Sequence, residues 1–142
     1  MDAVDYLVTV RALLGANIHV VKWEVIREEA QGDVGLYRYR VTLQDSSLLE
    51  MFERFEVQEN DFRVTKYSFQ WQSSDGQLRK RWDNATHHPE ISTHPHHVHD
   101  GPNDQVLPHE PVVADTVLAL INGLLDQERD DSGSFASSPG NE

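Results

Sequence analysis

Histidine is concentrated in one segment of the chain. Because proline lacks a backbone N–H and restricts the residue before it, the prolines of this segment exclude a helix and favour an extended path. Side chains two positions apart on an extended chain point to the same side, so His94 with His96, and His97 with His99, form candidate pairs. Seven of the 8 histidines belong to the segment: His87, His88, His94, His96, His97, His99 and His109.

Imidazole groups in such pairs suit acid and base catalysis, because an ordinary histidine pKa of about 6.5 allows proton exchange near neutral pH. Two imidazoles beside a cation can support RNA cleavage by the ribose 2′-hydroxyl without a metal ion. We expect His96 and His99 to be the acid and the base, and Arg81 to bind the phosphate. The candidate catalytic residues are His96, His99, His87, His88, Arg81 and Asp83.

Two other interpretations of the histidines remain open. Three imidazoles can bind a divalent ion such as zinc, for which His96, His97 and His99 are the candidate ligands, although their spacing is not a recognised zinc motif. The chain has no cysteine, which excludes thiolate ligands, disulfides and a cysteine nucleophile. Alternatively, the imidazoles only form hydrogen bonds to loop carbonyl groups.

The elements that position this segment follow from the hydropathy pattern. Residues 2–14 carry apolar side chains at helical spacing before Gly15, which predicts a helix. Alternation with a period of two predicts five strands, at about 18–28, 37–43, 48–57, 62–72 and 78–83. The short turns between these strands require antiparallel neighbours. Helical spacing returns at residues 113–125, which predicts a helix on the apolar face of the sheet.

We therefore expect one α+β domain over residues 1–130, with a five-stranded antiparallel meander sheet and a helix at each end. Residues 84–111 form a functional loop rich in histidine and proline, and residues 131–142 a disordered acidic tail. Trp23, Trp71 and Trp82 are in phase with core positions. The acidic and basic side chains of the third strand, Glu53 among them, are expected on a solvated face.

The charge balance limits the partners of the protein. Asp and Glu total 24 against 12 for Lys and Arg, a formal net charge of −12, which argues against non-specific binding to bulk nucleic acid or anionic membrane. Only three lysines occur, which fits either a halophilic source, because salt at about 1 M screens an acidic surface, or an ordinary acidic protein with a chance deficit of lysine. If Arg38 and Arg40 lie near Arg79 and Arg81, they form a cationic patch.

The termini and apolar runs suggest a location. The first residues are acidic where a secretory signal would be basic, so export is not expected. The longest apolar stretch, Val112 to Leu125, is 14 residues long and contains Asp115 and Asn122, whereas about 20 are needed to cross a bilayer. We expect a cytoplasmic protein with no membrane partner.

The stretch from Tyr67 to His99 resembles the TumE-type family of small prokaryotic toxins. The run that carries this resemblance is Arg81, Trp82, Asp83, Asn84, Ala85, His87, His88, Pro89, Pro95, His96, His97 and His99. The resemblance implies the toxin component of a toxin–antitoxin module, partnered by a small antitoxin protein with a DNA-binding domain.

Two functions follow as hypotheses. The first is a toxin that acts as a metal-independent endoribonuclease, with RNA as substrate and no required cofactor. The second is a non-catalytic regulatory domain that uses the histidine-rich loop to bind a metal or a protein, an alternative that the net charge of −12 favours. Exposed edge strands also allow a homodimer formed by continuation of the sheet.

Overall fold

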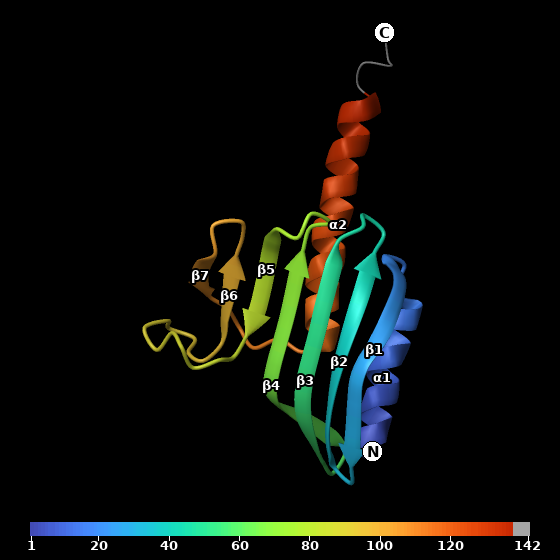
Figure 1. Ribbon diagram of the computed structural model, residues 1–142, viewed down its shortest axis with the longest axis vertical. Helices are drawn as coiled ribbons and strands as arrows, with labels where there is room; N and C mark the ends of the chain where they lie inside the picture. Colours follow the sequence, from blue (N-terminus) through green and yellow to red (C-terminus); the bar gives the residue numbers. More distant parts are fainter. Residues whose placement is uncertain (138–142) are drawn as a thin grey trace.

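A seven-stranded antiparallel sheet with two helices on one face forms the protein in the computed structural model, which describes residues 1–137 (Figure 1). The strands lie side by side in chain order, so each pairs with its neighbour in sequence. The elements are α1 (Ala3–Ala16), β1 (Val20–Gln31), β2 (Val34–Leu43), β3 (Leu48–Gln58), β4 (Asp61–Gln72), β5 (Leu78–Asp83), β6 (His97–Asp100), β7 (Gln105–Pro108) and α2 (Ala114–Ser137). The predicted α+β class, the antiparallel sheet and the two terminal helices are confirmed.

The first helix begins with reciprocal hydrogen bonds. The Asp5 N–H donates to Asp2 Oδ1 at 3.0 Å, and the Asp2 N–H donates to Asp5 Oδ2 at 2.8 Å. This capping box satisfies two of the N–H groups that a helix start leaves without partners. Tyr6, Leu7 and Val10 of α1 then pack into the core.

The core lies between the helices and one face of the sheet. Alternate residues of β2, β3 and β4 are buried there, and Trp71 and Trp82 are buried as their phase predicts. Each large apolar side chain buried in this way contributes about 1.5–3 kcal/mol. The helix residues that complete the core are Val117, Leu118, Ile121 and Leu125. Within residues 1–137 no helix or strand covers the opposite face, which we call the open face (Figure 1).

The number of strands differs from the prediction. The sheet has seven strands rather than five, because β6 and β7 form a hairpin inside the segment expected to be a loop. Each of these strands has only four residues, and prolines lie close to both, so the alternation is too short to recognise. The second part of the segment is therefore the outer edge of the sheet, and residues 84–96 form a turn segment before it.

The second helix is longer than its apolar pattern. It continues to Ser137, so residues 131–137, which we expected in the disordered tail, are helical, while residues 138–142 lie outside the described part of the chain. Gln127, Glu128 and Arg129 have good helix propensity and carry the helix past Leu125, where the predicted apolar pattern ends. Residues 131–137, mostly weaker helix formers, extend it because adding one residue to an existing helix costs less than starting one. No helix in residues 1–137 is long and apolar enough to cross a membrane.

Glu53 lies in the core rather than on the solvated face where we expected it. Its side chain is 0 % exposed, because it occupies the same phase of β3 as Met51 and Phe55. The hydroxyls of Tyr6 and Tyr37 donate to Glu53 Oε1 at 2.7 and 2.6 Å, and the Ala114 N–H donates to Oε2 at 3.2 Å. One buried carboxyl group thus joins both helices to the sheet.

The edges of the sheet are β1 and β7. The pairing of β1 with β2 is interrupted by register shifts at Val20/Lys22 and Val25/Arg27. Such bulges twist an edge strand and disfavour its pairing with another chain. The homodimer formed by sheet continuation stays a prediction.

Candidate functional site: a histidine cluster on the open face

The register of β5 and β6 decides which side chains reach the open face. Trp82 pairs with Val98, and both are buried toward the helices. Side chains of the residues on either side must point the opposite way. Arg81, paired with His99, and Asp83, paired with His97, therefore point to the open face.

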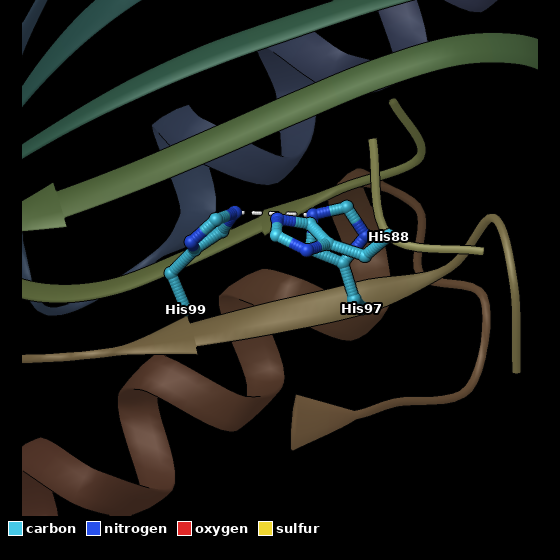
Figure 2. Close-up of side chains that lie close together, drawn as sticks. All are labelled: His88, His97 and His99. Atoms are coloured by element: carbon cyan, nitrogen blue, oxygen red, sulfur yellow. Dashed lines mark hydrogen bonds between the residues drawn. The ribbon is translucent and has the colours of Figure 1, made fainter. Parts of the chain in front are cut away.

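Three imidazoles meet at this position. We call His88, His97 and His99 the histidine cluster; one possible ligand atom from each lies within 4.8 Å of the others (Figure 2). His97 and His99 belong to β6, and His88 comes from the turn segment between β5 and β6. His97 Nε2 and His99 Nε2 are only 3.0 Å apart, so the expected pairing of His97 with His99 on one side of the chain is confirmed.

The Nδ1 atoms of His97 and His99 each lie beside a hydrogen-bond acceptor. His97 Nδ1 lies 2.9 Å from the carbonyl oxygen of Pro95, and His99 Nδ1 lies 2.7 Å from Asp104 Oδ1. A carbonyl or carboxylate oxygen only accepts, so each Nδ1 carries the hydrogen and donates it. In the neutral imidazoles both Nε2 atoms are then unprotonated, and their lone pairs face each other.

Asp83 brings further acceptor atoms to the same point. Its Oδ1 is 3.0 Å from His97 Nε2, and its Oδ2 is 3.5 Å from His99 Nε2. The carboxylate is almost wholly buried and also accepts hydrogen bonds from the Ala85 N–H and from Arg81 Nε, each at 2.9 Å. These bonds fix its orientation toward the two imidazoles.

Asp104 is a supporting residue that the sequence did not suggest. It lies in the tight turn between β6 and β7 with φ +54°, in the left-handed region where Asp and Asn are the commonest residues after glycine. This conformation places its carboxylate on His99 Nδ1. The sequence signal for this contact is an Asp five residues after a histidine, with a hairpin turn between them.

The remaining predicted site residues lie at varying distances from the cluster. His96 is not a member: its Nδ1 is 2.9 Å from the Tyr67 hydroxyl, and burial together with the nearby His97 and His94 lowers its pKa. His99 is therefore paired with His97 and not with His96, the expected partner. His88 takes the place of His96 in the predicted metal-ligand set, and His87 is not in the cluster.

Arg81, the expected phosphate clamp, lies beside the cluster. Its Nε donates to Asp83, and its Nη1 donates to Gln70 Oε1 at 2.8 Å. These bonds hold the guanidinium on the open face and use two of its N–H donors, so others remain for a ligand. Arg79, which we grouped with Arg81, instead lies on the helix side, with its guanidinium 3.8 Å from the Trp71 ring centre.

Basic side chains gather on the open face. Cross-strand partners point to the same side, so the registers place eight of the 12 Lys and Arg residues there: Lys22, Arg27, Arg38, Arg40, Arg54, Arg63, Lys66 and Arg81. Of the 24 acidic residues the same registers place six there: Glu24, Glu29, Glu50, Glu56, Asp61 and Asp83. The open face thus carries a small excess of basic side chains on a strongly acidic chain, and several of them form ion pairs with its acidic ones: Arg27 with Glu29, Arg38 and Arg40 with Glu50, and Arg81 with Asp83.

Two rows of cross-strand partners connect this surface to the cluster. One row runs Glu24, Arg40, Glu50, Gln70, Arg81, His99, and the other runs Arg27, Arg38, Phe52, Ser68, Asp83, His97. Both cross the sheet from the edge strand β1 to the histidines of β6. A ligand lying along the first row would therefore meet Arg81 and His99, whereas Asp83 and His97 at the end of the second row are buried.

The fold and the site define an α+β domain with an open, basic sheet face that ends in an imidazole cluster. A family model described as Toxin TumE matches residues 10–129, most of the chain, so the protein belongs to the TumE toxin family. Membership of a toxin family implies an antitoxin partner. The comparisons with curated proteins and with solved structures gave no match.

Proposed function

We propose that this toxin cleaves RNA, and that the histidine cluster with Asp83 and Arg81 is the centre of the reaction. The observation that carries the proposal is the convergence of two imidazoles and a carboxylate at the end of a basic sheet face. Proton transfer beside a bound phosphate is the chemistry for which these groups are suited.

The charge distribution supports RNA as the ligand. The net charge of −12 repels a polyanion, and taken alone it favours a regulatory domain. The repulsion is weaker on the open face, where basic side chains outnumber acidic ones. Arg38 also lies 4.9 Å from the centre of the Phe52 ring, which gives this face an aromatic group beside a cation. Such surfaces bind single-stranded nucleic acid through phosphates and stacked bases.

The proposed reaction is internal attack by the ribose. The 2′-oxygen bonds to phosphorus and gives its proton to a base in the cluster, while the bond from phosphorus to the 5′-oxygen breaks and that oxygen receives a proton from an acid. The products carry a 2′,3′-cyclic phosphate and a 5′-hydroxyl. Arg81 stabilises the negative charge that develops on the phosphate oxygens.

The test is incubation of the purified chain with total RNA, and with a single-stranded DNA of matched length, over a range from about 0.1 to 1 M KCl. We expect cleavage of RNA alone, with cyclic phosphate ends. The double variant His97→Ala, His99→Ala should lose this activity. His109→Ala is the matched control and should keep it, because His109 lies outside the cluster, with its Nδ1 on the carbonyl oxygen of Glu110 and its ring edge-on to the buried Trp82.

Absence of cleavage at every salt concentration, with and without added divalent metal, would reject the proposal. A non-catalytic metal-binding or protein-binding role for the histidine cluster would then be the better account. Equal loss of activity in the double variant and in His109→Ala would also count against it, because the cluster would not be the centre. Circular dichroism of each variant separates loss of activity from loss of the fold.

A further inference from the structure

We propose that the histidine cluster and Asp83 together bind one divalent transition-metal ion, with His88, His97, His99 and Asp83 as the ligands. The inference concerns the same site as the proposed function: with the ion bound the imidazoles are ligands, and a water molecule on the ion would take the place of the imidazole base. Ion binding itself follows from the four side chains and does not require that RNA be cleaved.

The first argument is the convergence of electron pairs. His97 Nε2, His99 Nε2 and the Asp83 oxygens approach within 3.0–3.5 Å of one another. Both Nδ1 atoms donate elsewhere, so in the neutral rings none of these converging atoms carries a hydrogen for the others. Lone pairs that face each other at 3.0 Å repel unless a cation lies among them.

The cation that satisfies this arrangement is either a proton or a metal ion. A proton on His97 Nε2 pairs the ring with Asp83 Oδ1 at 3.0 Å, but it leaves His88 without a role. A metal ion uses all three imidazoles and the carboxylate at once. A metal ion therefore accounts for more of the observed arrangement than a proton does. The two possibilities can be told apart by measuring whether the protein binds a metal.

The second argument is distance. Two nitrogens about 2.1 Å from a common ion lie about 3.0 Å apart at a right angle and about 3.4 Å apart at the tetrahedral angle. The separation of 3.0 Å between His97 Nε2 and His99 Nε2 falls at the first of these values. Ligands on opposite sides of such an ion are at most about 4.2 Å apart. The ligand atoms of the three histidines are up to 4.8 Å apart, so His88 needs to move inward by only a small distance to bind the ion. This residue lies in a turn segment and is partly exposed, so it can make that movement.

The third argument is the support behind each ligand. Metal-binding histidines usually donate their second ring N–H to a carbonyl or carboxylate, which fixes the tautomer and orients the ring. His97 has the Pro95 carbonyl, His99 has Asp104, and His88 Nδ1 lies 3.2 Å from Glu90 Oε1. All three imidazoles of the cluster have such a partner.

The donor set selects the class of ion. Imidazole nitrogen with a single carboxylate suits zinc, iron, nickel or copper, whereas magnesium and calcium prefer sites made of oxygen ligands. A divalent ion here would place positive charge beside Arg81 and would lower the pKa of a water molecule in its coordination sphere. Both effects serve phosphodiester cleavage.

The experiment is calorimetric titration of Zn²⁺ into the full chain after removal of metals with EDTA, without RNA. We expect one saturable site per chain. Alanine substitution of His88, His97 or His99 should lower the affinity for Zn²⁺ at least 10-fold. Asp83→Asn should also lower it. Asp104→Asn retains a residue that tolerates the left-handed turn but removes the carboxylate behind His99, so it should weaken binding by about 10- to 100-fold.

The controls are His96→Ala and His109→Ala, which lie outside the cluster and should bind Zn²⁺ within about twofold of the wild type. A side-chain NMR spectrum of the histidine nitrogens provides a second measurement: Zn²⁺ should shift the Nε2 signals of His97 and His99 and leave those of His96 unchanged. Circular dichroism and thermal unfolding of each metal-free variant confirm that it is folded.

Two results would overturn the metal site. One is the absence of a saturable site in the wild-type chain, and the other is unchanged binding in the triple variant His88→Ala, His97→Ala, His99→Ala. RNA cleavage by the EDTA-treated chain with no zinc site would reject this inference alone and leave metal-free imidazole catalysis. A zinc site that depends on the cluster, without cleavage under any condition, would reject only the proposed function.

Discussion

The Tyr37 hydroxyl donates a hydrogen bond of 2.6 Å to Glu53 Oε1 in the centre of the core. Burial raises the pKa of Glu53 to about 7, although the hydrogen bonds from Tyr37, Tyr6 and the Ala114 N–H act in the opposite direction. The desolvation of the carboxylate therefore outweighs three donors. A group of this kind couples the stability of the fold to pH.

Stability should fall as the pH rises through the pKa of Glu53. Between about 4.5 and 7 the folded protein binds a proton at Glu53 that the unfolded chain has released, so the free energy of unfolding decreases with rising pH. At about 1.4 kcal/mol per pKa unit, the full effect is about 3 kcal/mol. Urea unfolding at pH 5, 6, 7 and 8, compared with Glu53→Gln, isolates this contribution. Parallel pH profiles for the two proteins would contradict the prediction.

Gly101→Ala should separate β6 from β5. A Cβ atom at this position would lie 1.9 Å from the carbonyl oxygen of Leu78, a backbone atom that cannot rotate away. We expect destabilisation by at least about 3 kcal/mol, together with loss of zinc binding. Thermal unfolding measures the first effect and calorimetry the second.

Gly123→Ala is the matched control for this substitution. Gly123 lies inside α2, and nothing lies within 4 Å of its added Cβ. Alanine should stabilise the helix by about 0.5–1 kcal/mol, because glycine loses more backbone entropy on folding. Similar losses of stability in both glycine variants would show that the close approach to Leu78 is not the cause.

Removal of positive charge from the open face should weaken RNA binding and its dependence on salt. For single strands the slope of log K against log salt changes by about 0.7 for each phosphate that the protein neutralises. The triple variant Arg38→Gln, Arg54→Gln, Lys66→Gln should therefore reduce the slope by about 2 if each side chain meets a phosphate. Fluorescence anisotropy with a 2′-O-methyl RNA measures binding without cleavage. Arg129→Gln, which removes the same type of charge from exposed α2, should leave the slope unchanged.

Salt should stabilise the folded chain. With a net charge of −12 and two thirds of its basic residues on one face, the rest of the surface is dominated by carboxylates that repel each other. Screening at about 1 M reduces this repulsion. We expect a higher urea midpoint in 1 M KCl than in 0.1 M KCl at constant pH. An unchanged midpoint would remove support for the halophilic interpretation.

The long strands were predictable because their alternation is regular. Tyr37, Tyr39 and Val41 are buried in one phase of β2, and the pattern of β3 and β4 is equally clear. The phase of β3 also buries Glu53, but we interpreted its charge as a sign of exposure. Burial became possible because Tyr6 and Tyr37, distant in sequence, donate to it.

The candidate site was predictable only in part. The extended path that the prolines favour was enough to place His97 and His99 on one side of the chain. The selection of His88 over His96 depends on how the turn segment folds back over β6, and the Tyr67 hydroxyl holds His96 elsewhere. These contacts join residues that do not belong to one repeating pattern of the sequence, so no local alternation predicts them.

The chain order of the strands also determines the order in which the parts of the molecule can form during synthesis. Each new strand adds to the edge left by the one before it, from β1 to β7. The basic residues of β1 to β4 are therefore synthesised before His97 and His99, and the apolar residues of α2 that complete the core come last. A chain that ends before residue 97 would lack the histidine cluster and also α2, so the apolar face of its sheet would stay partly uncovered. The histidine cluster is thus completed late, and the core behind it is complete once α2 has followed.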